Sequence, residues 1–234
     1  MPNWVRNIVW FSGNKEKIAN LKAFVKSEDS EFDFNKIIPM PKELNFESGG
    51  KESVAIACAE ARMKGMLSCE DLERYSWLAE EMSFNAWADL GDKYLKNKKQ
   101  WGFTTWYDWH CHYWGTKWNS CEVKWVTEYC VRFDTAWNAP MPLFARLADM
   151  FPSIKIIINY ADENIGYNCD AVAFSSGGKD MFEFPKCAYY IEGSEEAEQF
   201  ACGIWGLNYD TWKSGEDEYE FEEPKTETVL NLLE

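Results

Sequence analysis

Residues 140–160 read PMPLFARLADMFPSIKIIINY, and this stretch has the clearest secondary-structure pattern in the chain. The two prolines at its start suit the first turn of a helix, where backbone amides lack intrahelical partners in any case. Apolar side chains then recur at helical spacing up to Phe151, and Pro152 ends the helix. Residues 154–160 predict a strand, and the three successive isoleucines within it indicate burial on both faces.

The N-terminal part predicts a similar order of elements. Residues 7–11 are a short apolar run typical of a strand, and Ser12-Gly13-Asn14 ends it and offers an N-cap for a helix. Apolar residues 18–25 recur three to four positions apart, which favours that helix. Residues 32–38 return to β character until Pro39, which cannot donate to a sheet ladder.

The middle of the chain predicts helices over residues 55–66 and 71–95. Residues 101–119 are rich in tryptophan and have no clean period of 2 or 3.6. Residues 123–133 alternate in part and predict one strand.

The predicted order is β-α-β, a helical insertion, then β-α-β, which is a split βαβ arrangement. Two further strands are expected over residues 171–174 and 182–191. The expected fold class is therefore α+β: a ferredoxin-like antiparallel sheet with a helical insertion and extra C-terminal strands. We expect this domain to span residues 1–191, with the insertion at about 51–100 between the second and third strands. An acidic extension, 192–234, would follow.

The charge is unevenly distributed. The chain has a formal net charge of −15. From residue 192 onward, 13 acidic residues stand against two lysines, whereas residues 1–191 hold 26 acids and 22 bases. Such a chain lacks the excess of Lys and Arg that displaces counterions from a phosphate backbone, which argues against direct nucleic-acid binding. A basic partner, including one that itself binds nucleic acid, would suit it better.

The sequence indicates a cytoplasmic protein. The first residues lack a basic segment followed by an apolar one, so we expect no signal peptide, and no apolar run approaches the length of a membrane helix. The eight cysteines form no CxxC pair, and in the absence of an export signal we expect reduced thiols.

Several short motifs recur in one known family. They are MPNW at residues 1–4, PMP at 39–41 with Glu43-Leu44, WGTKW at 114–118, Phe133 with TAW at 135–137, Pro140, Pro142, and Phe151-Pro152. In these motifs the chain resembles the YubB ferredoxin-like domain proteins that phages and plasmids encode. The family has Cys where this chain has Val5, and Asn where it has Tyr113. The resemblance implies the fold and a mobile-element origin, and it implies no catalytic chemistry.

No catalytic or metal site is predicted. His110 and His112 flank Cys111, and Cys121 follows, but a structural zinc site usually includes a cysteine pair two to four residues apart. A nucleophilic Cys121 with one of these histidines is conceivable, although nothing else in the sequence supports it. We therefore expect no metal, no cofactor and no enzyme activity, and we favour ordinary packing of these rings.

The WGTKW run has two interpretations. In the structural one, Trp114 and Trp118 pin the loop to the core and Thr116 bonds to the backbone. In the functional one, Lys117 sits among Trp114, Trp118 and Trp137 and forms a cation–aromatic site for a partner or ligand.

A second candidate binding segment is the acidic run Glu216, Asp217, Glu218, Glu220, Glu222 and Glu223. Like charges this dense resist compact packing and favour an interaction with a basic surface. The leading hypothesis is thus a non-enzymatic phage- or plasmid-borne protein that binds a host protein. Its target would be a defence or nucleic-acid-handling factor, which it counteracts through an acidic, aromatic-rich surface. The alternative is a small-ligand or single-stranded nucleic-acid binding module that uses the Trp-rich loop 101–118.

Overall fold

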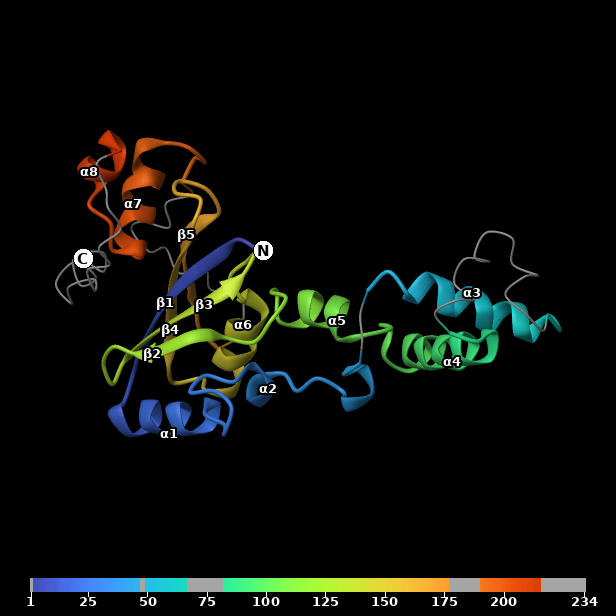
Figure 1. The fold of residues 1–234 in the computed structure, drawn as a ribbon. Coiled ribbons are helices and arrows are strands. Elements are labelled where there is room, and N and C mark those ends of the chain that lie inside the picture. Colours follow the sequence, from blue (N-terminus) through green and yellow to red (C-terminus); the bar gives the residue numbers. More distant parts are fainter. Residues whose placement is uncertain (1, 47–48, 67–81, 177–189, 216–234) are drawn as a thin grey trace. The chain divides into compact units, whose positions relative to one another are not determined.

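The computed structural model describes residues 2–46, 49–66, 82–176 and 190–215. Within them, a five-stranded antiparallel sheet has the strand order β2-β3-β1-β4-β5 (Figure 1). The strands are β1 (Trp4–Ser12), β2 (Cys121–Trp125), β3 (Cys130–Ala136), β4 (Lys155–Asp162) and β5 (Cys169–Phe174). The helices are α1 (Lys15–Val25), α2 (Phe34–Ile37), the 3₁₀ turn η1 (Lys42–Leu44), α3 (Glu52–Met63), α4 (Phe84–Trp101), α5 (Trp106–Tyr113), α6 (Met141–Met150), α7 (Glu195–Trp205) and α8 (Tyr209–Ser214).

The order β1-α1-β2-β3-α6-β4 gives the split βαβ topology of a ferredoxin-like sheet. Strand β1 pairs antiparallel with both β3 and β4, and β2 pairs antiparallel with β3. Strand β5 extends the sheet beyond β4. The predicted fold class, including an extra C-terminal strand, is confirmed. The other strand expected there, over residues 182–191, falls mostly outside the described residues.

The chain divides into two compact units. The sheet unit comprises residues 1–39 and 113–234, and the helical unit comprises residues 40–112. In sequence, the helical unit enters between α1 and β2, that is, between the first helix and the second strand. The predicted position between the second and third strands was wrong, because the segment taken for the second strand is not a strand. The domain limits at about 51–100 and at 191 stay predictions.

The predicted strand over residues 32–38 is the short helix α2. Asp33 caps it, since its carboxylate accepts the backbone N–H of Asn35 at 2.9 Å. The Asn119 side chain donates to Asp33 at 2.8 Å and accepts the N–H of Phe34 at 2.9 Å. A cap assembled from residues far apart in sequence therefore outweighs the local alternation that favoured a strand.

The predicted single strand over residues 123–133 is a hairpin of β2 and β3. The chain reverses over residues 126–129, where Val126 N–H donates to the carbonyl of Cys130 at 2.9 Å. Thr127 Oγ1 accepts the N–H of Tyr129 at 3.1 Å. This turn contains no Gly, Pro or Asn, so the usual sequence signal of a hairpin is missing.

The sheet face that carries α6 packs as an aromatic core. Phe32 stacks on Phe133 with ring centroids 5.2 Å apart, and Phe34 meets Phe133 edge-on at 5.8 Å. Phe144 of α6 lies 6.4 Å from Phe133. All four rings are fully buried. Much of the unusual aromatic content is therefore used for packing in the core.

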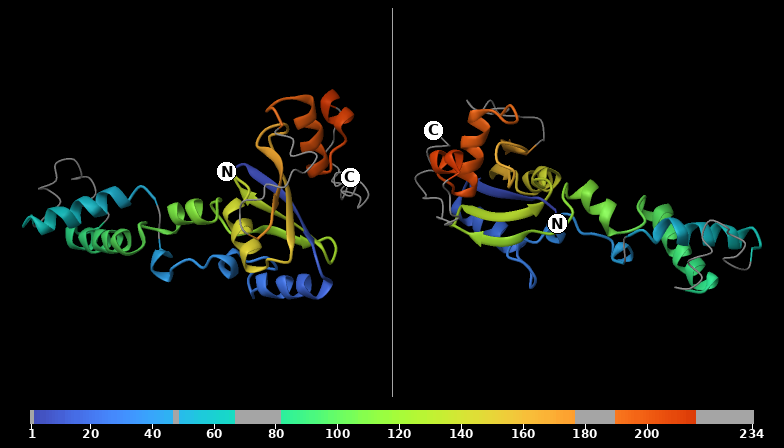
Figure 2. Two further views of the ribbon diagram at one scale, coloured as in Figure 1. Left: turned by 180° about the vertical axis from the view of Figure 1, so that it is seen from behind. Right: turned by 45° about the horizontal axis from the view of Figure 1, so that its top comes forward.

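Helix α7 packs on the opposite sheet face. Phe200, Ala201 and Ile204 form one buried cluster with Ile8 of β1 and Cys130 of β3. Figures 1 and 2 show α7 in orange, on the far side of the sheet from α1. The Ser194 hydroxyl caps α7 by accepting the N–H of Ala197 at 3.2 Å. Part of the segment predicted as an acidic extension thus contributes to the core of the sheet unit.

None of the helices in the described segments is long and apolar enough to cross a membrane.

The helical unit is built on the packing of α3 against α4. Its buried cluster contains Trp87 and Tyr94 of α4, both almost fully excluded from solvent. The two helices approach most closely at Gly91, where a Cβ atom would lie 1.9 Å from the carbonyl oxygen of Ala55. No side chain fits at this position unless the helices separate.

We expect Gly91→Ala to destabilise the α3–α4 pair by at least the ~1–3 kcal/mol typical of overpacking. The measurement is hydrogen exchange with mass spectrometry on peptides covering 52–63 and 84–101, where protection should fall. Gly203→Ala in α7 is the control, because a Cβ there meets nothing within 4 Å. In this control the free energy of unfolding should increase by about 0.5–1 kcal/mol, because alanine favours a helix more than glycine does. Unchanged protection in Gly91→Ala would contradict the close approach.

Candidate functional site

The structure places Trp114 in the core of the sheet unit. Its side chain is 1% exposed, and the indole Nε1 donates to the carbonyl of Ile38 at 2.9 Å. Its ring meets Phe34 edge-on at 5.6 Å. Trp114 therefore anchors the loop after α5 and offers no surface to a partner.

The next two residues fix the path of this loop. Gly115 has φ 79°, and a Cβ there would lie 2.8 Å from Cδ of Pro142, so glycine is required on both grounds. Thr116 is 1% exposed, and its hydroxyl donates to the carbonyl of Ala136 at 2.7 Å. Thr116, predicted as a binding residue, is thus placed in a structural role.

Lys117, Trp118 and Trp137 do come together. The Lys117 Nζ lies 4.5 Å from the ring centroid of Trp118 and 5.0 Å from that of Trp137. The ring of Trp4 lies 5.8 Å from that of Trp118. We call these four residues the tryptophan cluster. Three of the four residues predicted to form a cation–aromatic site are thus in contact, and Trp114 is not among them. Whether this cluster binds a partner or ligand stays a prediction.

Trp137 is held in an uncommon conformation. It has φ 72°, in the left-handed region that non-glycine residues seldom occupy, and its side chain is 36% exposed. Its N–H donates to the carbonyl of Asn3 at 2.9 Å, and its own carbonyl accepts from Asn168 Nδ2 at 2.9 Å. The backbone on both sides thus fixes a large, partly exposed ring.

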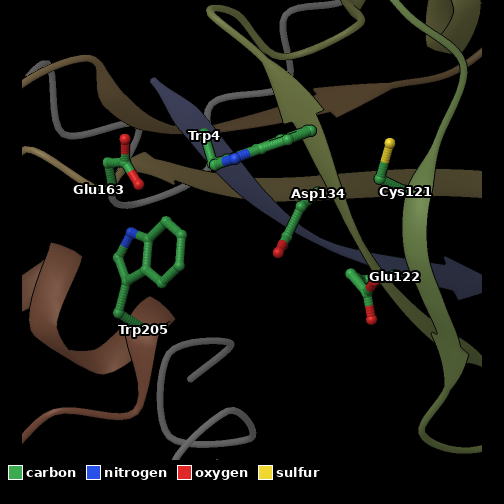
Figure 3. A pocket seen from close by; sticks show the side chains of 6 residues that line it. All are labelled: Trp4, Cys121, Glu122, Asp134, Glu163 and Trp205. Atoms are coloured by element: carbon green, nitrogen blue, oxygen red, sulfur yellow. The ribbon is translucent and has the colours of Figure 1, made fainter. Parts of the chain in front are cut away.

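A pocket of about 380 Å³ adjoins this cluster through Trp4 (Figure 3). It is lined by Trp4, Cys121, Glu122, Asp134, Glu163 and Trp205. Trp205 comes from the end of α7, and the other residues come from β1, β2, β3 and the residue that follows β4. In Figure 3 Trp205 and Glu163 lie on one side of Asp134, Glu122 and Cys121 lie on the other, and the Trp4 ring extends above it.

A buried ion pair lies beside the pocket. Arg6 Nε and Nη2 donate to the two carboxylate oxygens of Asp134 at 3.1 and 3.3 Å. The Arg6 guanidinium carbon also lies 4.2 Å from the ring centroid of Trp205. Trp205 Nε1 donates to the carbonyl of Asp162 at 2.9 Å. This hydrogen bond fixes the orientation of the indole ring on which Arg6 lies.

The pocket lining is acidic. It contains the carboxylates of Asp134, Glu122 and Glu163, and Arg6 pairs with that of Asp134. Arg132 of the same sheet lies outside the lining. Burial lowers the pKa of Arg132, and the charge of Arg6 lowers it further, against the opposing effect of Asp134 and Glu122. The pocket is therefore suited to a positively charged group.

The geometry does not favour nucleophilic chemistry in this pocket. Burial raises the pKa of the Cys121 thiol, and the charges of Asp134 and Glu122 raise it further, so the thiol stays protonated near neutral pH. In the helical unit, the ring centroid of His110 lies 5.3 Å from that of Trp106, and that of His112 lies 5.3 Å from that of Phe103. Both histidines thus pack against aromatic rings. Among the described residues, no group of three or more His, Cys, Asp or Glu side chains could hold a metal ion.

The predicted acidic segment Glu216 to Glu223 lies outside the described residues. Just before it, Lys213 of α8 pairs with Glu198 of α7 at 2.5 Å. Sequence reasoning missed Glu122, Asp134, Glu163 and Trp205 as pocket residues. Their grouping depends on the β2–β3 hairpin and on the docking of α7, and neither was predicted.

We expect Trp114→Ala to lower the free energy of unfolding by ~3–5 kcal/mol, as truncation of a buried aromatic ring does. Lys117→Ala should cost less than about 1 kcal/mol, the scale of a partly exposed cation–aromatic contact. Chemical denaturation followed by circular dichroism measures both. The reverse order of effects would show that Trp114 is not a core residue.

Residues 113–203 match the family model described as the ferredoxin-like domain in Api92-like protein. Among solved structures, the crystal structure of a protein Api92 from Yersinia pseudotuberculosis is similar at 12% sequence identity and a TM-score of 0.40. That similarity covers 76% of this chain and 96% of the Yersinia chain. No curated protein matches the sequence. The segment 113–203 is thus similar to the ferredoxin-like domain of Api92-like proteins.

Proposed function

We propose that this chain is a non-enzymatic phage- or plasmid-borne protein that binds a basic host protein. One observation carries the proposal: Trp4 belongs both to the tryptophan cluster and to the wall of the acidic pocket. The two features therefore share one residue of the sheet unit. We call the tryptophan cluster and the pocket together the binding face.

The chemistry of the binding face fits a protein partner. Tryptophan is enriched among the few interface residues that contribute most of the binding free energy. Trp137 is partly exposed, and hydrogen bonds hold its backbone in place. An aromatic ring that is already ordered loses little entropy on binding. The exposed carboxylates of Glu122 and Glu163 in the pocket lining would steer a basic partner toward this face.

A nucleic-acid-handling or defence factor is the class of partner that this charge favours. Such proteins carry basic surfaces that normally meet phosphates, and an acidic protein can occupy them by charge mimicry. The net charge of −15 supports this class. The acidic C-terminal segment would add to the attraction.

The partial exposure of Trp137, beside Lys117, also favours the second candidate, a module that binds a small ligand or a single-stranded nucleic acid. An exposed indole next to a cation could stack a base. Loop residues Trp114 and Thr116 cannot take part in this binding, because both are buried.

The proposed partner should cross-link at Trp137. We expect a photoreactive phenylalanine analogue at this position to capture one basic protein in host cells. The same analogue at Tyr129, which is 37% exposed on the β2–β3 turn, is the matched control. When the cross-linking is repeated in host lysate, capture should weaken as the salt concentration is raised, since the Debye length falls to ~3 Å at 1 M.

The products are identified by mass spectrometry, with and without nuclease. A basic protein captured from position 137 and not from position 129 supports the proposal. Cross-links to nucleic acid that nuclease removes would favour the second candidate. Equal capture from both positions would contradict a specific binding face.

A further inference from the structure

We propose that the pocket of the binding face takes one guanidinium group, the end of an arginine side chain from the partner protein. This inference rests on the proposed function and names the chemistry of its central contact. The pocket is walled by Trp4 and Trp205 and carries the carboxylates of Glu122 and Glu163.

The molecule already contains one arginine side chain that is bound by a tryptophan ring and a carboxylate. The guanidinium of Arg6 lies over the Trp205 ring at 4.2 Å and makes two hydrogen bonds to the carboxylate of Asp134. Arginine suits such a place because its planar fork matches a carboxylate and stacks on an aromatic face. Trp4 with Glu122 or Glu163 offers a second arginine the same two types of contact.

The size of the pocket sets an upper limit on the ligand. A volume of about 380 Å³ lies at the low end of the ~300–1,000 Å³ range of ligand sites. A side chain fits such a space better than a large cofactor does. Its entry would displace water from the Trp4 ring, since Arg6 already lies over the Trp205 ring. A cation over an aromatic ring gains most when it is desolvated.

The charges around the pocket also favour a cation. Its lining carries three carboxylates, and two arginines act on them: Arg6 pairs with Asp134, and Arg132 interacts with the charges of Asp134 and Glu122. The carboxylates of Glu122 and Glu163 belong to residues exposed to solvent. They can therefore turn toward an incoming guanidinium without rearranging the core.

The test uses the purified full-length protein and N-acetyl-arginine methylamide as the probe. Titration is followed by the indole ¹⁵N–¹H signals of Trp4 and Trp205, assigned with single Trp→Phe variants. Both signals should shift in a saturable manner. The citrulline analogue, which has nearly the same shape and no charge, should produce no saturable shift. The lysine analogue should bind several-fold more weakly, because its ammonium cannot stack as a plane.

Glu122→Gln and Glu163→Gln should each weaken binding of the arginine probe about 3- to 10-fold, since each removes one carboxylate. The matched control is Glu128→Gln, an exposed glutamate that pairs with Lys15 on the β2–β3 turn. It should leave the affinity unchanged. All three positions are exposed, so none of the changes should affect folding.

Equal binding of the citrulline or lysine analogue, or an equal effect of Glu128→Gln, would overturn the inference. So would the absence of saturable shifts. If Trp137 cross-links specifically but the arginine probe gives no saturable shift, the proposed function is supported and this inference is refuted. Probe binding without any captured protein would support a guanidinium pocket and refute the host-protein function.

Discussion

The ion pair between Arg6 of β1 and Asp134 of β3 joins these two strands, and the contact of Arg6 with Trp205 adds helix α7. Both charged residues are at least nine-tenths buried, and their strands are neighbours in the sheet. Withdrawing two charges from water is costly, so such a pair contributes little net stability. Removing one partner would nevertheless leave a buried charge unpaired, so that an altered β1–β3 pairing is penalised by several kcal/mol. Arg6 also lies against Trp205, which ties α7 to the same place.

The two faces of the sheet consequently have different roles. The face that carries α6 is filled with aromatic rings around Phe133 and is closed to solvent. The other face is covered by α7 beside β4 and β5, and the end of that helix forms one wall of the pocket. Polar strand residues are present on both faces: Arg6 and Asp134 lie on this one, and the buried Asn7 and Thr135 share the face of Phe133, where the Asn7 amide donates to Thr135 Oγ1 at 2.9 Å. The helix that completes the second core therefore also bounds the binding face.

The sequence predicted the elements whose signals are local. Strand β1, helix α1 with its Asn14 cap, helix α6 and strand β4 all follow from periodicity and from proline or cap positions. The errors occurred where distant residues decide the outcome. Asn119 completes the cap of α2, and the β2–β3 turn is closed by backbone and Thr127 hydrogen bonds without a glycine. Lys117, Trp118 and Trp137 could be grouped from sequence because two of them are adjacent. The pocket could not be predicted, since its lining comes from five separate segments.

The WGTKW loop links the core to the binding face within five residues. Trp114 points inward to Phe34, and Trp118 contacts Trp4 at the edge of the pocket. Between them, the left-handed Gly115 turns the chain and the buried Thr116 hydroxyl ties it to the end of β3. Trp137 directly follows β3. The hydrogen bond from Thr116 to Ala136 therefore also holds the loop close to the Trp137 ring, over which Lys117 lies. The structural interpretation of this motif therefore holds for Trp114 and Thr116, and the functional one stays a prediction for Lys117 and Trp118. The position of the tryptophan cluster depends on the anchoring of the buried Trp114 ring.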